Sequence, residues 1–429
     1  MADVRVLLVG NGGREHAIAW KLSQSPRIDQ IFVVPGNGGT GALTKTQNVE
    51  SIKADDFPAL SKFALENNVN LLIPGPEAPL VDGIVDHFNK HAPQVKCFGP
   101  SGSAARMEGS KTFSKDFMHR HNIPTAAYQN FTSHDAAKAY LDSVSHPVVI
   151  KASGLAAGKG VIIPTTKEEA HQALKDIMLD REFGSAGDEV VIEEFLEGDE
   201  LSILTFSDGT SIQSLPPAQD HKRIFDGDQG PNTGGMGTYS PTRIAPKEIV
   251  DQIEKEVLQP TVDGMKAEGY PMVGCLFTGL MMTKNGPKVL EYNVRFGDPE
   301  TQSLLPLMDS DLAELMLACT DSKLGSFQLK VGEKSAATVV VAAGGYPGSY
   351  KKGVEMKLDP VPNDTVHFHA GTSLKDGILR TSGGRVIAST AWAPTLEEAV
   401  QKAYKGVEAI HFEGMQYRKD IAGRALKKN

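Results

Sequence analysis

Strand-like apolar runs alternate with helical segments through the first hundred residues. The expected strands and helices, in chain order, cover residues 4–9, 14–23, 31–34, 55–67 and 71–73. Continuous apolar strands with intervening helices are typical of a parallel sheet covered on both faces. Ligands of such sheets bind beyond the carboxyl ends of the strands. We therefore expect the glycine-rich turns that follow these strands to share one rim.

The rest of the chain changes character twice. Residues 101–190 resemble a small α+β module. The following part, to about residue 330, has strands that suit one antiparallel sheet, at 190–195, 201–206, 274–283 and 288–293. A last module of three strands and a helix is expected at 337–343, 366–370, 385–391 and 396–410. Segment 215–241 lacks both periodicities, and its length favours a functional loop.

Composition excludes several classes of protein. The 44 basic and 53 acidic residues give a net charge of −9, which argues against nucleic acid as the main partner. The three cysteines, Cys97, Cys275 and Cys319, lie too far apart for a CxxC pair, a zinc ribbon or a disulfide scaffold, and suit a reducing compartment. No apolar run reaches the ~20 residues that cross a bilayer.

The first glycine turn, at 10–13, opens a helix but does not complete a dinucleotide fingerprint. That fingerprint requires glycine where Glu15 stands and an acid at the end of the second strand, which here ends in 34–37 (VPGN). NAD binding is therefore not expected. The turn either holds a phosphate on the helix N-terminus or is a tight turn without a ligand.

A second glycine loop, at 154–160, differs from the nucleotide-binding P-loop. Its glycines are one residue too close, and Gly160 stands in place of the Ser or Thr. The loop joins two expected strands, so it is either a flexible hairpin tip or a flap over phosphates. Lys151 on the preceding apolar strand favours the flap, because burying an ammonium without an anion is costly.

Two acidic segments and the long loop are further candidates. In 290–300 (LEYNVRFGDPE), Glu291, Asn293 and Arg295 point to one strand face. Glutamate and asparagine offer the oxygen ligands that Mg²⁺ takes beside nucleotide phosphates, and arginine holds a carboxylate or phosphate. The alternative is a solvated polar edge. The acidic segment 193–200 is a weak signal for an adenine slot, and the loop carries 219–223 (QDHKR) and 230–237 (GPNTGGMG).

Taken in order, these motifs resemble the glycinamide ribonucleotide synthetase family of ATP-grasp carboxylate–amine ligases. The resemblance spans essentially all 429 residues and also includes 35–40 (PGNGGT), 75–80 (GPEAPL) and 417–421 (YRKDI). It implies a parallel α/β N-terminal domain at 1–105, an ATP-grasp domain at 106–330 with a lid at about 125–192, and an α+β C-terminal domain at 331–429.

The resemblance also implies site residues. Those that bind ATP would be Lys111, Lys151, Gly158, Lys159, Gly160, Glu193, Glu194, Phe195, Leu196, Glu200, Arg223 and Asn232. Those that bind the other substrates would be Gly10, Gly12, Gly13, Asn37, Gly38, Glu77, Asp220 and Arg295, with Arg295, Asp220 and Lys151 the catalytic group. Glu291 and Asn293 would hold Mg²⁺ or Mn²⁺. The strand 275–283 adds no acid for a second metal, and Lys115 lies close enough to exchange roles with Lys111.

The implied reaction joins glycine to 5-phosphoribosylamine with ATP, through glycyl phosphate, in the second step of purine synthesis. A cytoplasmic enzyme is expected, with small-molecule substrates, no nucleic acid or membrane partner, and either free-standing or fused to other purine enzymes. Two alternatives stay open. One is another ATP-grasp ligase, such as a biotin-dependent carboxylase subunit or a formate-using purine enzyme. The other is a nucleotide-binding regulatory or scaffold protein.

Overall fold

The computed structural model describes residues 2–156 and 159–427. Its N-terminal unit is a parallel sheet, as the apolar runs predicted, and has five strands in the order β3-β2-β1-β4-β5. Every residue of β1 except Arg5 is buried. The strands are β1 (Val4–Gly10), β2 (Ile28–Pro35), β3 (Thr46–Asn48), β4 (Leu71–Pro74) and β5 (Lys96–Cys97). The helices are α1 (Gly13–Ser23), η1 (Thr40–Ala42), α2 (Phe57–Glu66), α3 (Glu77–Val81) and α4 (Ile84–His91).

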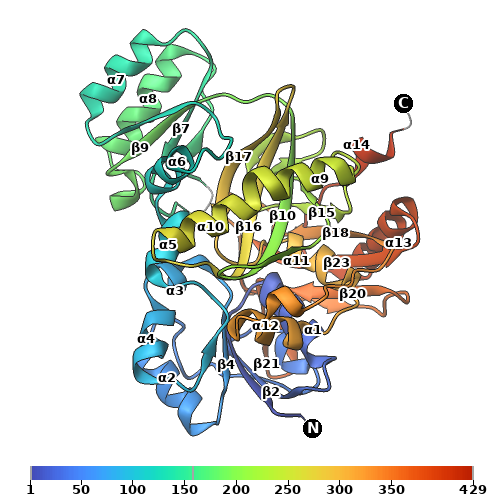
Figure 1. Cartoon of the computed structure of the whole chain (residues 1–429). Helices are drawn as coiled ribbons and strands as arrows, with labels where there is room; N and C mark the ends of the chain where they lie inside the picture. Colours follow the sequence, from blue (N-terminus) through green and yellow to red (C-terminus); the bar gives the residue numbers. More distant parts are fainter. Residues whose placement is uncertain (1, 157–158, 428–429) are drawn as a thin grey trace.

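Two short helices lead from this unit into a small antiparallel sheet, the lid, in the order β6-β9-β7-β8. It stands at the upper left of Figure 1. The connecting helices are α5 (Gly102–Gly109) and α6 (Lys111–Arg120). The lid comprises β6 (Tyr128–Phe131), α7 (His134–Ser143), β7 (Val148–Ala152), β8 (Val161–Ile162), α8 (Lys167–Met178), η2 (Gly184–Gly187) and β9 (Val190–Glu194). The prediction that 190–195 joins the 201–206 sheet is wrong, because Val190 and Ile192 pack into the lid core under α7 and α8.

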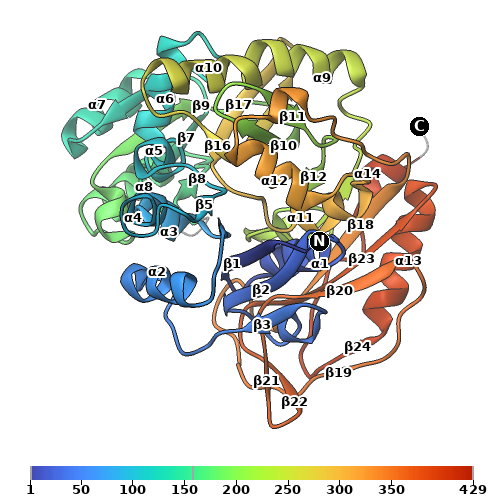
Figure 2. The same cartoon turned by 60° about the horizontal axis from the view of Figure 1, so that its bottom comes forward.

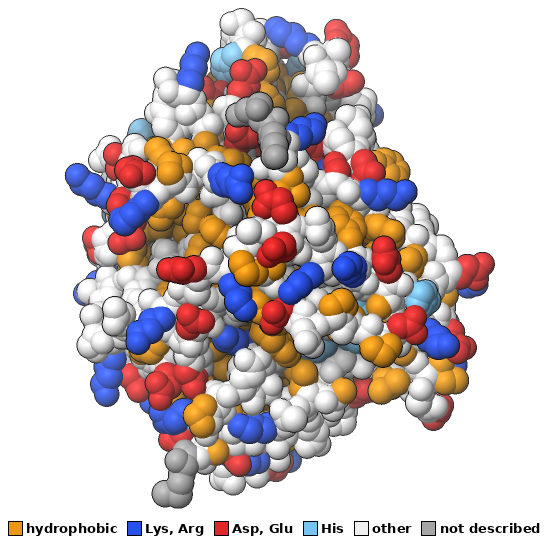
Figure 3. All heavy atoms as spheres, turned by 90° about the vertical axis from the view of Figure 1, so that its right-hand side faces the viewer, with side chains coloured by type: hydrophobic (Ala, Val, Ile, Leu, Met, Phe, Trp, Pro, Cys, Tyr) orange, Lys and Arg blue, Asp and Glu red, His pale blue; other side chains and the backbone are white. Residues whose placement is uncertain are grey.

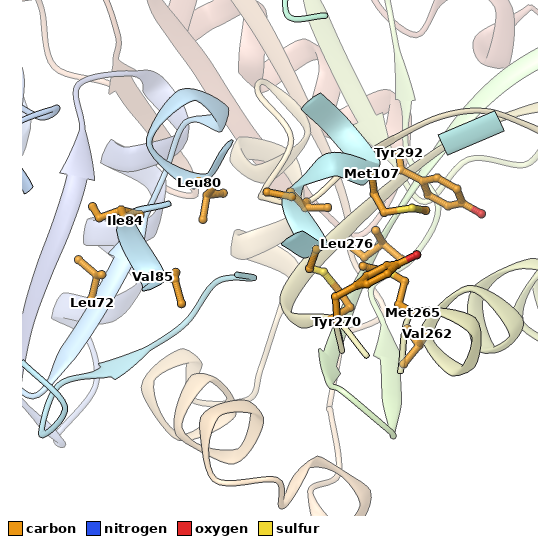
Figure 4. Packing of buried hydrophobic residues seen from close by; sticks show 14 of the residues in the cluster. Leu72, Leu80, Ile84, Val85, Met107, Val262, Met265, Tyr270, Leu276 and Tyr292 are labelled. Atoms are coloured by element: carbon orange, nitrogen blue, oxygen red, sulfur yellow. The ribbon is translucent and has the colours of Figure 1, made fainter. Parts of the chain in front are cut away.

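The central sheet is antiparallel, in the order β11-β10-β16-β17. Its strands are β10 (Asp199–Asp208), β11 (Ile212–Ser214), β16 (Val273–Thr283) and β17 (Gly286–Asn293). Its helices are α9 (Lys247–Ile253), the π-turn η3 (Glu254–Leu258), α10 (Gln259–Ala267), α11 (Glu300–Leu304), η4 (Leu305–Leu307), α12 (Leu312–Thr320) and η5 (Leu324–Ser326). Figure 4 shows Val262 and Met265 of α10 near Leu276 of β16, and Met107 of α5 beside Tyr292 of β17, all in one cluster with Leu72, Leu80, Ile84 and Val85 of the N-terminal unit. One apolar core thus joins the central sheet to the N-terminal unit.

The C-terminal unit is a five-stranded sheet, β12-β15-β18-β23-β20, covered by α13. Its elements are β12 (Gln219–Asp220), β15 (Gly237–Ser240), β18 (Ser335–Ala342), β20 (Thr365–His369), β23 (Arg385–Ala393), α13 (Leu396–Glu408) and α14 (Gly423–Leu426). Three two-stranded ribbons accompany it, β13 (Arg223–Phe225) with β14 (Gln229–Asn232), β19 (Lys357–Leu358) with β24 (Ile410–His411), and β21 (Thr372–Lys375) with β22 (Ile378–Thr381). Segment 215–241 is therefore not an unstructured loop. Its strands, of two to four residues each, are too short to show periodicity.

The N-terminal and C-terminal units lie side by side, with α1 against β20 (Figures 1 and 2). The backbone N–H of His369 on β20 donates to Nδ1 of His16 on α1 at 2.7 Å. On the face seen in Figure 3, basic and acidic side chains are interspersed. Among the described residues, no helix has the length and apolar character needed to cross a membrane.

Candidate active site

The three glycine turns of the N-terminal unit meet on one rim, as predicted. Backbone N–H groups of Gly36 and Gly75 donate to Gly10 and Val9, and the Asn37 side chain donates to the Asn11 carbonyl at 3.0 Å. The amide of Asn37 also donates to the His369 carbonyl at 2.8 Å. The backbone N–H of Gly38 donates to Thr372 at 3.1 Å. Asn37 and Gly38 therefore contact the C-terminal unit.

Glu15 fills the centre of this rim, a role that sequence reasoning missed. Its buried carboxylate accepts from the Gly12 N–H at 2.6 Å and pairs with Arg14 at 2.6 Å. A Cβ at Gly10 or Gly75 would lie 2.5 or 2.0 Å from Glu15 atoms, so a larger residue at either position would displace the Glu15 side chain. Glu at the third position of a helix after a glycine turn is a capping signal that could have indicated this.

Arg295 lies just beyond β17 and is surrounded by acidic and amide oxygens. Its guanidinium lies 2.9 Å from Glu108 Oε1 and 3.6 Å from Glu77 Oε2. It also donates to Asn293 Oδ1 at 3.2 Å. Burial would raise the pKa of Glu77, but Arg295 outweighs it and holds that pKa below the usual value. Glu108, buried on α5, was missed because its partner is almost 190 residues away.

Three lysines of α6 and β7 lie where the lid meets β17. Lys151 Nζ lies 3.0 Å from Glu193 Oε1 and donates to the Leu290 carbonyl of β17 at 3.2 Å. Lys115 Nζ lies 3.5 Å from Glu193 Oε2 and donates to Thr125 Oγ1 at 2.7 Å, and burial lowers its pKa to about 8. Lys111 instead donates to the Gly154 carbonyl of the glycine loop at 3.1 Å. The sequence predicts an anion beside Lys151, because burying an unpaired ammonium is costly. In the structure, the carboxylate of Glu193 is such an anion.

The acidic segment after β9 connects the lid to the central sheet. Glu193 turns its carboxylate inward to the lysines, whereas Glu194 pairs with Lys288 at 3.1 Å. Phe195 is 39% exposed, and Leu196 is buried against Ala126 and Met281. The segment therefore presents one exposed aromatic ring above an apolar floor, a suitable surface for a flat base.

The glycine loop joins β7 to β8, so it is a hairpin as expected. The Ala152 N–H donates to the Gly160 carbonyl at 2.8 Å, and the Lys159 N–H donates to Ala156 at 2.9 Å. A Cβ at Gly160 would lie 2.7 Å from Ala156 Cβ, which explains glycine at that position. Gly158 falls outside the described residues.

Glu291 and Asn293 lie on one face of β17, with lysines around the carboxylate. Glu291 Oε1 lies 3.9 Å from Lys222 Nζ, which also lies 3.4 Å from Glu200 Oε2. Partial burial opposes the charge of Glu291, but Lys222, Lys151 and Lys111 hold its pKa below the usual value. No group of three or more His, Cys, Asp or Glu able to hold a metal occurs among the described residues. The two oxygen donors fit Mg²⁺ or Mn²⁺ only if phosphate oxygens and water complete the ligand set.

Asp220 on β12 lies near Glu300 at the start of α11. Burial, together with Glu300, raises the pKa of Asp220 well above its usual range. Asp220 Oδ1 accepts from the His221 N–H at 2.7 Å, and a Cβ at Gly235 would lie 2.8 Å from the same oxygen. Glu300 is 3% exposed and was not predicted as a site residue. Two adjacent carboxylates, one buried on Glu300 and one partly buried on Asp220, favour a cation between them.

Arg223 and Asn232 face each other across the β13–β14 hairpin. Arg223 NH1 donates to the Gly230 carbonyl at 2.7 Å, and Asn232 is exposed. The base of the hairpin is closed by Thr233, whose N–H donates to the Lys222 carbonyl at 2.7 Å. The hairpin therefore begins directly after Lys222, whose ammonium lies 3.9 Å from the Glu291 carboxylate.

A small lid sheet and a larger antiparallel sheet, with lysines on one and a carboxylate–amide pair on the other, define an ATP-grasp protein. Models of the phosphoribosylglycinamide synthetase family match its N domain at residues 4–108, its ATP-grasp (A) domain at 109–301 and its C domain at 336–424. The chain belongs to this family, which confirms the predicted resemblance.

Individual relatives agree with the family match. The chain is 59% identical over 430 residues to a bifunctional purine biosynthetic protein of Schizosaccharomyces pombe, covering 99% of this chain and 54% of that protein. It is 49% identical to a phosphoribosylamine–glycine ligase of Vibrio vulnificus, over 99% of both. A crystal structure of the Thermotoga maritima phosphoribosylamine–glycine ligase superposes with a TM-score of 0.82 at 35% identity, covering 98% of this chain and 100% of that one. The chain spans about half the length of the first curated relatives that it matches.

Proposed function

We propose that this chain joins glycine to 5-phosphoribosylamine, converting ATP to ADP and phosphate and forming glycinamide ribonucleotide. One observation carries the proposal. The carboxylate of Glu291 lies 3.9 Å from Lys222 Nζ at the junction of the lid and the central sheet, and Lys222, Lys151 and Lys111 hold its pKa below the usual value. Excess positive charge beside one metal-ligand carboxylate suits a nucleoside triphosphate, whose phosphates neutralise the lysines. The family and the full-length Vibrio relative support the ligase activity.

The phosphoryl donor would be held by residues of both sheets. Lys111 and Lys151 would neutralise phosphate oxygens, and the hairpin 154–160, with Lys159 and Gly160, would cover them. Segment 193–196 would border the adenine, Glu200 would accept from the ribose, and Arg223 and Asn232 would approach from the β13–β14 hairpin. Glu291 and Asn293 would hold Mg²⁺ or Mn²⁺, which when bound screens the phosphate charge.

The carboxylate of glycine would be held by Arg295 and its ammonium by Asp220. An ammonium beside Asp220 and Glu300 relieves the repulsion that raises the pKa of Asp220. The carboxylate attacks the γ-phosphorus, ADP leaves, and the sugar amine then displaces phosphate from glycyl phosphate. No protein nucleophile takes part, so positioning and charge neutralisation carry catalysis.

The phosphoribosyl group would lie along the glycine rim of the N-terminal unit. Gly10, Gly12 and Gly13 would offer backbone to the phosphate, and Glu77 would approach from α3. Asn37 and Gly38 would act by shaping the rim, because their polar groups bond to β20 and β21 residues.

The proposal also covers the domain boundaries of the chain and the place of the enzyme in the cell. It divides the chain at 1–105, 106–330 and 331–429, and it places the enzyme in the cytoplasm. Eukaryotic relatives are named as bifunctional and trifunctional purine biosynthetic proteins, which supports association with other enzymes of that route. The proposed partners of this chain are otherwise its small-molecule substrates.

The test is a coupled ADP-release assay with glycine and freshly made phosphoribosylamine, each omitted in turn. We expect ADP release only with both present, and glycinamide ribonucleotide in equal amount. ADP release without glycine, or with another carboxylate in its place, would indicate a different ATP-grasp ligase.

A further inference from the structure

We propose that Arg418 is a positioning residue that fixes the β13–β14 hairpin, and through it Lys222, for the nucleoside triphosphate. The inference rests on the proposed function for the identity of the ligand. It gives a role to the C-terminal segment 417–422, which the reaction itself does not use.

Arg418 is the largest fully buried side chain of the described residues and is 1% exposed. Its Nε and NH2 donate to the two oxygens of Asp420, both at 2.8 Å, in a bidentate pair. Its NH1 donates to Asp228 Oδ1 at 2.9 Å and to the Arg223 carbonyl at 3.2 Å. One guanidinium thus connects its own segment to the start of β13 and to the end of the hairpin turn.

Two more hydrogen bonds join the same pieces of chain. The Gly227 N–H donates to Asp420 Oδ2 at 2.8 Å, and the Lys419 N–H donates to Asp226 Oδ1 at 2.8 Å. All three turn residues 226–228 are therefore held by residues 418–420. Segment 418–420 thus holds the tip of the hairpin. The hydrogen bond from the Thr233 N–H to the Lys222 carbonyl closes its base.

A second support lies on the other side of Lys222. The Ala422 N–H donates to His221 Nε2 at 3.1 Å, so His221 Nδ1 carries the proton and donates to the Gly237 carbonyl at 3.0 Å. Lys222 therefore lies between two points held by segment 417–422, at His221 and at the Arg223 carbonyl. Its ammonium reaches Glu200 and Glu291 from that fixed backbone.

This arrangement favours a positioning role over a purely stabilising one. Buried ion pairs give little net stability because desolvation offsets their attraction. The carboxylates of Asp228 and Asp420 are 39% and 34% exposed, so removing Arg418 leaves them in contact with water. Loss of the guanidinium should therefore release the hairpin more than it unfolds the chain.

The test compares Arg418→Met and Arg418→Lys with Arg424→Met. Arg424 is a matched control because it also pairs with Asp228, at 3.3 Å, from a side chain that is 54% exposed. ATP affinity is measured by calorimetry and by KM, and the mobility of the hairpin by trypsin cleavage after Lys222 and Arg223. We expect Arg418→Met to weaken ATP binding about tenfold and to speed that cleavage, with kcat changed less than KM. Arg418→Lys should recover only part of this, because an ammonium lacks the fork.

The proposal would be overturned if Arg418→Met bound ATP as tightly as the parent and was cleaved after Lys222 and Arg223 at the same rate. If Arg418→Met fails to fold, Asp420→Asn breaks the same bidentate pair with little change in volume and is expected to give the same two effects. Failure of the proposed function is separate, because it appears as ADP release by the parent that does not depend on glycine and phosphoribosylamine.

Discussion

The carboxylate of Glu193 lies 3.0 Å from the ammonium of Lys151, and both side chains are buried. The second oxygen of Glu193 faces Lys115 at 3.5 Å. The resemblance assigns Glu193 to the adenine hinge, and that assignment stays a prediction. Its side chain instead balances two ammonium groups and fixes Lys151 against β17. Glu193 therefore has a part in orienting the lysine proposed to contact phosphate.

Replacing Glu193 by glutamine should weaken ATP binding. The amide keeps the shape but leaves Lys115 and Lys151 without a counter-charge, so we expect KM for ATP to rise at least about tenfold. Glu168→Gln is the control, because Glu168 lies at an exposed position of α8, outside the residues assigned to ATP. Equal KM values for the two variants would contradict the role of Glu193.

Glu291→Ala should abolish most turnover while leaving the fold intact. The side chain is 39% exposed, so its loss creates no buried cavity. We expect kcat to fall at least ~10²-fold, the scale of losing one preorganised electrostatic group. Turnover is measured across a Mg²⁺ titration and folding by thermal unfolding. Near-normal activity at ordinary Mg²⁺ would refute the metal-pair assignment.

Arg295→Lys should lower kcat/KM for glycine by about tenfold or more, because one ammonium cannot replace a bidentate fork. The lysine would also lose part of the contact with Glu108 and Asn293. Arg243→Lys is a control at an exposed position. Unchanged kcat/KM for glycine would contradict the role of Arg295 and would indicate that Lys222 or Arg223 binds the glycine carboxylate.

Acid should destabilise the chain through His221. Burial lowers its pKa to about 4, whereas an unfolded histidine titrates near ~6.5. Because the unfolded chain binds the proton first, stability falls as the pH drops through this interval, by up to about 3 kcal/mol from this residue. Urea unfolding from pH 7 to pH 4 measures the slope. His221→Gln should make the profile shallower, and an equally steep profile would contradict this assignment.

The N-terminal unit could be predicted because its signals are local. The buried run of β1 and the glycine turns lie within a few residues of one another, and the structure confirms both the parallel sheet and the shared rim. The strand at 190–195 was assigned to the wrong sheet, since an apolar strand does not specify its partner. The sequence pattern of segment 215–241 predicts a loop because its four strands have only two to four residues each.

The candidate site was predictable only where motifs are contiguous. Glu291, Asn293 and Arg295 come from one strand and its extension. By contrast, Glu108, Glu300 and Arg418 act on partners brought close by folding, and neither spacing nor residue type indicates those contacts. Long-range ion pairs of this kind depend on tertiary packing, which a single sequence does not display.

The central claim is that glycine is activated as an acyl phosphate, and oxygen transfer tests it most directly. Glycine carrying heavy oxygen in its carboxylate is turned over with ATP and phosphoribosylamine, and the released phosphate is examined by mass spectrometry. We predict one labelled oxygen in the phosphate per turnover, because the carboxylate oxygen that attacks the γ-phosphorus leaves with it. Unlabelled phosphate, with all label retained in glycine and product, would contradict the mechanism.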